Sequence, residues 1–266
     1  MKIREIRAKS IITKSNLPDA DYVINPYIGC MHSCLYCYAR FMKRFTGHIE
    51  SWGKFVDVKI NASDLIPAKT TKYCGKSIFL SSVTDPYLPL ERKYKLTRKI
   101  LEKLIPLQPN LSVLTKSDLV LHDIDLFRQF KRCDVGITIT TLNDNLRKEI
   151  EPFASPVQDR INALKKLKDS GIRTYVFIGP ILPFLTNWKE IITKTKKYSD
   201  FYMFENLNVR GPIWHSVEKW LGQKHPELLD NYRKIYFSKS IYWNNTEKEI
   251  KQFCKEQKVA CRVYFH

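Results

Sequence analysis

The chain has 266 residues and carries 45 Lys and Arg against 27 Asp and Glu, so its formal net charge at pH 7 is +18. A hydrophobic content of 44% excludes a disordered chain, and 9 Gly and 13 Pro exclude a collagen-like or linker-like one. The longest apolar stretch, 174–185, contains two prolines and is shorter than the ~20 residues of a membrane-spanning helix. The first five residues lack the apolar region of a secretory signal. We therefore expect a soluble, cytoplasmic protein without membrane contact.

Short apolar, β-branched runs alternate with helical patterns over the first part of the chain. The predicted strands are Tyr22–Tyr27, Ser77–Val83, Leu111–Thr115, Val135–Thr140, Arg173–Ile178 and Phe201–Phe204. The predicted helices between them are Leu96–Ile105, Asp118–Phe130, Pro156–Ser170 and Trp188–Tyr198. Six β/α units in succession predict an α/β fold, a partial (β/α)6 barrel of the TIM type with parallel strands.

The pattern changes after Arg210. The remaining segments predicted as regular structure are three helices and a last strand, Ile213–Leu221, Pro226–Ser238, Asn245–Gln257 and Val259–Phe265. No internal repeat or linker marks a boundary. We predict a single domain over residues 1–266, with a barrel core (1–210) and a helical C-terminal extension (211–266) packed on it.

Three of the seven cysteines lie within eight residues, Cys30, Cys34 and Cys37. An odd number cannot be fully paired, so we expect free thiols in a reducing compartment. The C-x-x-x-C-x-x-C spacing follows the first predicted strand, which places it at the carboxyl-terminal rim of a barrel, where such folds carry their active sites.

Thiolates in this spacing bind either zinc or an iron–sulfur cluster. A structural zinc site needs four ligands, usually from two cysteine pairs, and no second pair stands elsewhere in the chain. Three thiolates in one tight loop suit a cubane cluster with one iron left open. A zinc or redox loop remains the alternative at this point.

The loop resembles the signature of the radical SAM superfamily, and within it the chain is similar to the spore photoproduct lyase-related group, also described as DNA repair photolyase-like. The resemblance covers roughly residues 9–190. The motifs that carry it are Asn25-Pro26-Tyr27-Ile28-Gly29-Cys30, Tyr36-Cys37-Tyr38-Ala39-Arg40, Val83-Thr84-Asp85-Pro86-Tyr87, Leu114-Thr115-Lys116-Ser117 and Glu151-Pro152 followed by Arg160.

The resemblance implies a partial barrel of the radical SAM type and an enzyme with two cofactors. The three cysteines would hold a [4Fe-4S] cluster, whose open iron binds S-adenosylmethionine (SAM). One-electron reduction would then split SAM into a 5′-deoxyadenosyl radical that abstracts hydrogen from a substrate. The implied partners are a nucleic acid substrate and a reducing electron donor of the flavodoxin or ferredoxin type, and we expect a monomer.

The resemblance also assigns cofactor-binding roles to four residues near the barrel rim. Tyr36 would lie against the adenine of SAM. Thr84 and Asp85 would hold its amino group, although the same segment also reads as a turn before Pro86. Lys116, at the end of the third predicted strand, would meet the SAM carboxylate.

Five further residues are candidates for SAM binding on the later units. Thr138 and Thr140 share one face of the fourth predicted strand and would supply hydroxyl contacts, or they reflect strand propensity alone. Arg160 would bind a carboxylate bidentately or pair with Glu151. Ile178 and Asn206 would flank the adenine.

One position departs from spore photoproduct lyases, which carry a hydrogen-donating cysteine in the stretch that aligns with residues 82–85. Here the matching residue is Ser82, and a hydroxyl is a much poorer hydrogen-atom donor than a thiol. Spore photoproduct reversal is therefore not expected. His32 and His122 are interpreted as ordinary loop or surface histidines.

The basic residues cluster in 92–103, 165–168 and 194–197, with tyrosines and tryptophans interleaved. This is the composition of a nucleic-acid-binding protein, although solvated lysines on outer helix faces give the same pattern. Three hypotheses follow: radical SAM chemistry on a nucleic acid, the same chemistry on a peptide or small molecule, and a non-catalytic, metal-stabilised nucleic-acid-binding protein.

Overall fold

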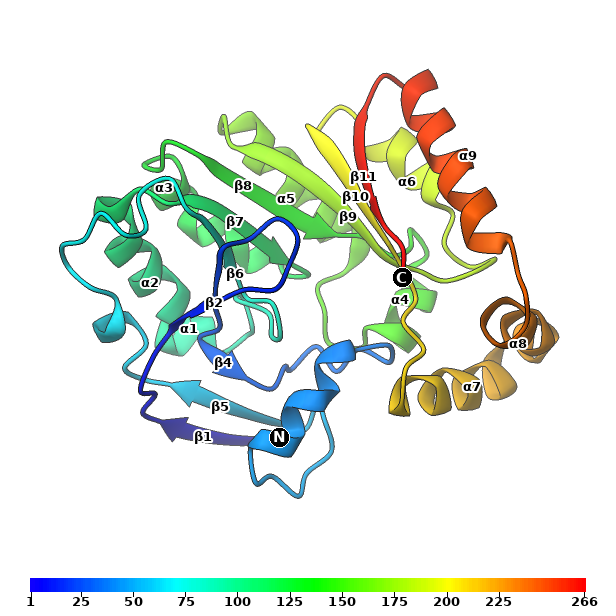
Figure 1. The fold of residues 1–266 in the computed structure, drawn as a ribbon, viewed down its shortest axis with the longest axis horizontal. Helices are drawn as coiled ribbons and strands as arrows, with labels where there is room; N and C mark the ends of the chain where they lie inside the picture. Colours follow the sequence, from blue (N-terminus) through cyan, green and yellow to red (C-terminus); the bar gives the residue numbers. More distant parts are fainter.

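A computed structural model describes all 266 residues. Its main sheet has eight strands in the order β11-β10-β9-β8-β7-β6-β3-β2 (Figure 1). Every neighbouring pair is parallel except β2 and β3. The strands are β2 (Ile12–Lys14), β3 (Tyr22–Ile24), β6 (Ser77–Leu80), β7 (Asn110–Thr115), β8 (Cys133–Thr138), β9 (Arg173–Ile181), β10 (Phe201–Asn206) and β11 (Ala260–Tyr264). Strands β3 and β6 to β10 are the six predicted parallel strands of the partial barrel.

Helices cover the outer face of this sheet and enclose the main apolar core between sheet and helices. They are α2 (Leu96–Leu104), α3 (Ile124–Phe127), α5 (Val157–Asp169) and α6 (Trp188–Thr195). Two shorter helices, α1 (Glu91–Tyr94) and α4 (Asp144–Ile150), pack on the smaller apolar clusters instead. Short 3-10 helices are η2 (Ser63–Leu65), η3 (Ile105–Leu107), η4 (Asp118–Asp123) and η5 (Pro226–Leu228). The predicted helix 118–130 is η4 followed by the single turn of α3, and α4 was not predicted because it is only two turns long.

A second sheet of three strands lies beside the barrel and was not predicted. Its order is β1-β5-β4, with β1 (Lys2–Ile6), β5 (Phe55–Lys59) and β4 (Tyr27–Ile28). β1 is rich in charged residues and β4 has only two residues, so neither shows the apolar run by which strands are predicted. The cysteine loop follows β4 and continues into the 3-10 helix η1 (Tyr38–Phe45).

The C-terminal extension contains the predicted helices, α7 (Pro212–Lys224), α8 (Leu229–Phe237) and α9 (Tyr242–Glu256). Its last strand, β11, pairs in parallel with β10 along five residues and so enlarges the main sheet. The extension is therefore a continuation of the sheet and not only a layer packed on the barrel. Figure 1 shows α7 and α8 apart from α9, and they share a smaller apolar core with Cys34 and Tyr36. None of the helices has the length and apolar character needed to cross a membrane.

Candidate functional site

Cys30, Cys34 and Cys37 line one cavity of about 1620 Å³ that occupies the inside of the partial barrel. Cys30 and Cys34 are buried and Cys37 is half-buried, and all three thiols are free. The carboxyl ends of the strands contribute Thr84, Asp85, Lys116 and Asn206 to the same cavity, among other residues. The cysteine loop thus lies at the rim predicted for the chemistry.

The small sheet supports the cysteine loop at two close approaches. Gly29 has φ +92°, and a Cβ there would lie 2.4 Å from the carbonyl oxygen of Phe55 in β5. Gly53 has φ +85°, and a Cβ there would lie 2.2 Å from Oγ of Ser33, inside the loop. A side chain at either position would be strained at the positive φ and would collide with these atoms, so both positions require glycine. The two glycines let the cysteine loop pack directly against β5 and against the turn before it.

The chemistry of the three thiols fits an iron–sulfur cluster better than a single metal ion. No three His, Cys, Asp or Glu side chains of the structure are arranged around one ion position, as a zinc site would require. In a cubane cluster each thiolate binds a different iron, so the sulfurs need not converge. Burial raises the pKa of the Cys34 thiol to about 12, although Lys116 opposes it, and burial also raises the pKa of Cys30 and Cys37. Cluster assembly therefore has to displace these protons.

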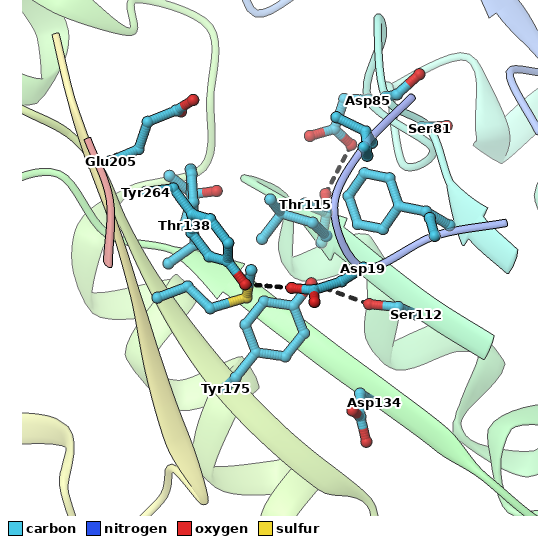
Figure 2. A pocket seen from close by; sticks show the side chains of 18 of the residues that line it. Asp19, Ser81, Asp85, Ser112, Thr115, Asp134, Thr138, Tyr175, Glu205 and Tyr264 are labelled. Atoms are coloured by element: carbon cyan, nitrogen blue, oxygen red, sulfur yellow. Dashed lines mark hydrogen bonds between the residues drawn. The ribbon is translucent and has the colours of Figure 1, made fainter. Parts of the chain in front are cut away.

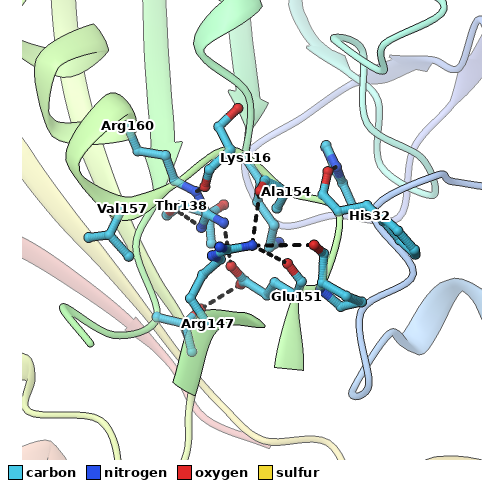
Figure 3. A network of polar contacts seen from close by, with 12 residues as sticks. His32, Lys116, Thr138, Arg147, Glu151, Ala154, Val157 and Arg160 are labelled. Carbon is cyan, nitrogen blue, oxygen red and sulfur yellow. Dashed lines mark hydrogen bonds and ion pairs between the residues drawn. The ribbon is translucent and has the colours of Figure 1, made fainter. Parts of the chain in front are cut away.

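Asp85 forms a hydrogen-bonded junction between the cysteine loop and the third strand of the barrel. Its carboxylate accepts from Thr115 Oγ1 (2.6 Å), from the Lys116 amide (2.9 Å) and from the Tyr87 amide (2.8 Å). His32 Nε2 lies 3.1 Å from Oδ2 of the same carboxylate (Figures 2 and 3 show the two ends of this junction). Burial raises the pKa of Asp85, but His32, Thr115 and the Lys116 amide outweigh it and lower the pKa to about 2. Asp85 thus holds the turn at the rim together, and because Thr84 and Asp85 both line the cavity, their contact with the SAM amino group stays a prediction.

Two residues around Asp85 are also tied to the cysteine loop. Thr84 lines the cavity, and its hydroxyl donates to the Gly29 carbonyl over 2.6 Å. His32 is not the ordinary loop histidine that we expected: its side chain is 3% exposed and also reaches the Phe153 carbonyl, 3.2 Å from Nδ1. Its position within the cysteine motif was the only available signal. His122 lies outside this junction, as expected.

Glu151 is the centre of a buried polar network behind the cavity (Figure 3). Its Oε1 accepts from the Tyr36 hydroxyl and from Thr140 Oγ1, and its Oε2 lies 2.6 Å from Arg160 Nη2. Burial raises the pKa of Glu151, but Arg160 and Lys116 outweigh it and hold the pKa below its ordinary value. The carboxylate therefore stays ionised inside the protein.

This network corrects two of the predicted cofactor contacts. The other two nitrogens of Arg160 donate to the carbonyls of Ser155 and Thr138, so each guanidinium nitrogen has a partner inside the protein, and Arg160 does not line the cavity. Of the two roles left open by the sequence, Arg160 has the ion pair with Glu151. Thr140 does not line the cavity either, because β8 ends at Thr138 and the Thr140 hydroxyl turns to Glu151.

Lys116 and Tyr36 both line the cavity, and their contacts with the SAM carboxylate and adenine stay predictions. Lys116 Nζ lies 5.8 Å from the centre of the Tyr36 ring. Burial lowers the pKa of Lys116, but Cys34 and Glu151 outweigh it, and the pKa is raised. Asp85 and Glu151 are both engaged by other donors, which leaves the Lys116 ammonium able to receive an external carboxylate.

The remaining candidates for SAM binding are Thr138, Ile178 and Asn206, and only two of them line the cavity. Thr138 points into the cavity, as do Tyr175 and Tyr264 from nearby strands (Figure 2). Ile178 does not: Tyr175, Phe177 and Gly179 of β9 line the cavity, whereas Val176 and Ile178 face the helices and belong to the main core, which corrects the predicted adenine contact of Ile178. Asn206 lines the cavity, and its side-chain amide is hydrogen-bonded to the backbone of His266.

The fold and the cysteine loop together define an α/β-barrel protein that carries an iron–sulfur cluster at the carboxyl ends of its strands. Residues 24–193 match the radical SAM superfamily. This match covers more than half of the chain, which therefore belongs to the radical SAM superfamily.

Among its relatives, the chain is 47% identical over 230 residues to an uncharacterized protein of Methanocaldococcus jannaschii, covering 86% of each. It is 26% identical over 168 residues to the radical SAM Nalpha-GlyT isomerase of Pseudomonas phage M6, covering 62% of this chain and 34% of the isomerase. Its fold is similar to that of a spore photoproduct lyase variant, with a TM-score of 0.73 and 18% identity over 99% of this chain and 82% of the lyase.

Superfamily membership establishes a [4Fe-4S] cluster and SAM as the cofactors. The residues that would hold the cluster are Cys30, Cys34 and Cys37. When bound, the cluster supplies the electron that cleaves SAM and yields a 5′-deoxyadenosyl radical. The protein is thus a radical SAM enzyme, and the non-catalytic hypothesis is not retained.

Proposed function

We propose that this radical SAM enzyme abstracts hydrogen from a nucleic acid, for repair or modification. The observation that carries the proposal is an aromatic–basic surface beside the cysteine loop. We define this surface by six residues, Tyr38, Phe41, Arg44, Phe45, Lys54 and Phe153.

Two groups of aromatic and basic side chains on this surface are in contact. The Arg44 guanidinium lies 4.6 Å from the centre of the Phe45 ring and 5.7 Å from that of Phe41. Lys54 Nζ lies 5.9 Å from the Phe153 ring. Phe45 is 65% exposed and Phe153 is 57% exposed, although large aromatic rings are normally buried. Rings for base stacking next to cations for phosphate are the elements of single-stranded nucleic acid binding.

The aromatic–basic surface is continuous with the cavity. Tyr38 is 46% exposed on the surface and at the same time lines the cavity. Enzymes that act on a base first take it out of the helical stack and bind it in a pocket. A nucleotide extruded from a strand on this surface would enter the cavity close to the cysteine loop. A solved spore photoproduct lyase of similar fold binds a dinucleoside spore photoproduct, which supports a substrate of this class.

The proposed reaction differs from spore photoproduct reversal because position 82 carries a serine and no free thiol besides the three cluster ligands lies at this rim. Ser82 lines the cavity near the rim. Besides the cluster ligands, the cavity wall contains one cysteine, Cys133. It is the first residue of β8 and therefore lies at the amino-terminal end of that strand, away from the rim. We also propose that a reducing protein of the ferredoxin or flavodoxin type supplies the electron and that the enzyme is a cytoplasmic monomer.

The test is SAM cleavage by the anaerobically reconstituted enzyme under dithionite, with 5′-deoxyadenosine quantified by chromatography. Single-stranded DNA, duplex DNA, RNA and a mixed peptide pool are added separately. We expect 5′-deoxyadenosine in every sample and an increase with one of the nucleic acids, together with loss of that increase in Phe41→Ala/Phe45→Ala. Cys34→Ala is the blank, because without the third thiolate no cluster forms.

Stimulation by the peptide pool alone, or no stimulation by any nucleic acid, would refute the nucleic acid substrate and favour a peptide or small molecule. Full activity in Cys34→Ala would refute the cluster assignment itself.

A further inference from the structure

The loop between η1 and β5 places a tryptophan against one of the cluster-binding cysteines. Trp52 Nε1 lies 3.2 Å from Cys37 Sγ and donates a hydrogen bond to it. An indole N–H can only donate, so the sulfur is the acceptor. Trp52 is half-buried at the edge of the apolar cluster that contains Cys30.

The Trp52 ring is held in place from two sides. Its ring and that of Phe55 meet edge to face, with ring centres 5.8 Å apart at 88°, and Phe55 in turn stacks on the buried His48 at 3.9 Å. The next residue, Gly53, packs directly against Ser33 in the cysteine loop. The indole N–H is therefore oriented toward Cys37 Sγ by packing contacts that lie outside the cysteine motif itself.

Backbone groups of the loop also act on the sulfurs: Ala39 opposes the rise in the pKa of Cys37, and His32 opposes the rise in the pKa of Cys30. Backbone donors belong to the loop conformation itself. Trp52, by contrast, donates to Cys37 from its side chain. A substitution at position 52 therefore removes this donor without altering the backbone of the cysteine loop.

We propose that Trp52 sets the reduction potential of the [4Fe-4S] cluster through its N–H···S hydrogen bond to Cys37. Hydrogen bonds to the sulfurs are among the factors that determine iron–sulfur potentials. Reduction adds negative charge, which spreads onto the cysteine sulfurs, so the bond to Trp52 strengthens in the reduced state. Trp52 therefore makes the cluster easier to reduce and acts as a positioning residue that need not touch SAM or substrate.

The test compares the wild-type holoenzyme with Trp52→Phe and with a variant that carries β-(3-benzothienyl)alanine at position 52. The benzothienyl ring keeps the shape of indole but has sulfur in place of the N–H. Iron and sulfide are assayed first, and the midpoint potential is then measured by redox titration monitored by electron paramagnetic resonance, without SAM. We expect full cluster content and about a tenfold smaller equilibrium constant for one-electron reduction in both variants, a shift of about 59 mV to more negative potential.

Trp188→Phe is the matched control. Trp188 packs in the main core against Phe204 and Phe253, and its replacement should leave the potential unchanged. An unchanged potential in the benzothienyl variant would overturn the proposal, whatever Trp52→Phe does. Loss of the cluster in that variant would also overturn it, because the N–H would then be needed for assembly and not for tuning.

Discussion

At the scale of single residues, Glu151 decides how the wall behind the cysteine loop is held together. Its carboxylate is fully buried and joins Tyr36 of the cysteine loop, Thr140 after β8 and Arg160 of α5. Arg147 closes the turn that follows by donating to the carbonyls of Glu151, Pro152 and Ala154. A buried charge is stable only when its partners compensate it, so removing one partner of a buried ion pair destabilises the fold by leaving the other charge uncompensated.

We predict that Arg160→Met lowers the free energy of unfolding by about 3–5 kcal/mol, because Glu151 is left as an uncompensated buried charge. Arg262→Met is the control: its pair with Asp19 is half-exposed and should contribute less than about 1 kcal/mol. Urea unfolding of both variants measures the difference. A stable Arg160→Met that has lost SAM binding would instead restore Arg160 as a cofactor ligand.

At the scale of elements, the packing of the small sheet against the barrel depends on a buried acid. Glu91 at the start of α1 accepts hydrogen bonds from the Tyr27 hydroxyl in β4 and from the Thr97 amide in α2. Burial raises the pKa of Glu91 from 4.5 to about 7, against the effect of these hydrogen bonds. The cysteine loop starts two residues after Tyr27, so this packing also determines where the loop begins.

The raised pKa predicts a stability that falls as pH rises. The folded state binds the Glu91 proton more tightly than the unfolded state, so the contribution is complete below pH 4.5 and is lost as pH approaches 7. We expect wild type to lose about 3 kcal/mol relative to Glu91→Gln over this window. Urea unfolding of cluster-free protein between pH 4.5 and 8 tests it, with the exposed Glu102→Gln as control. Parallel curves for wild type and Glu91→Gln would show that Glu91 has an ordinary pKa.

At the scale of the whole molecule, the excess of positive charge is unevenly compensated. On the outer helices, Lys165 pairs with Asp169 and Lys168 with Asp200. Lys93 and Lys95, on α1 and directly after it, are exposed, and Tyr94 between them packs on the apolar cluster that contains Cys30. The charge near the cysteine loop is thus available to a polyanion, while much of the charge on α5 is neutralised locally.

We predict that reversing Lys93, Lys95 and Lys99 to Glu weakens nucleic acid binding by similar factors for unrelated sequences. The plot of log K against log salt should become shallower by about 0.7 to 0.9 for each phosphate that the variant no longer binds. Fluorescence anisotropy at several salt concentrations measures the slope. Reversing Lys165, Lys166 and Lys168 on α5 changes the charge equally and should leave binding and SAM cleavage nearly unchanged. Equal effects of the two triple variants would mean that net charge alone governs binding.

The sequence by itself determined the order of β/α units and the position of the cysteine loop, because these depend on local periodicity and on spacing within a single loop. The two cofactors followed from the resemblance of its motifs to the radical SAM superfamily. Only the tertiary structure decided which face of β9 carries Ile178, since both faces of a buried parallel strand are apolar and the pattern does not distinguish them. The same holds for Arg160 and Glu151, Asp85 and His32, and Trp52 and Cys37. These pairs come from different elements, and their proximity depends on how the strands close into a barrel and on a small sheet in which β4 is too short and β1 too charged to be recognised in the sequence.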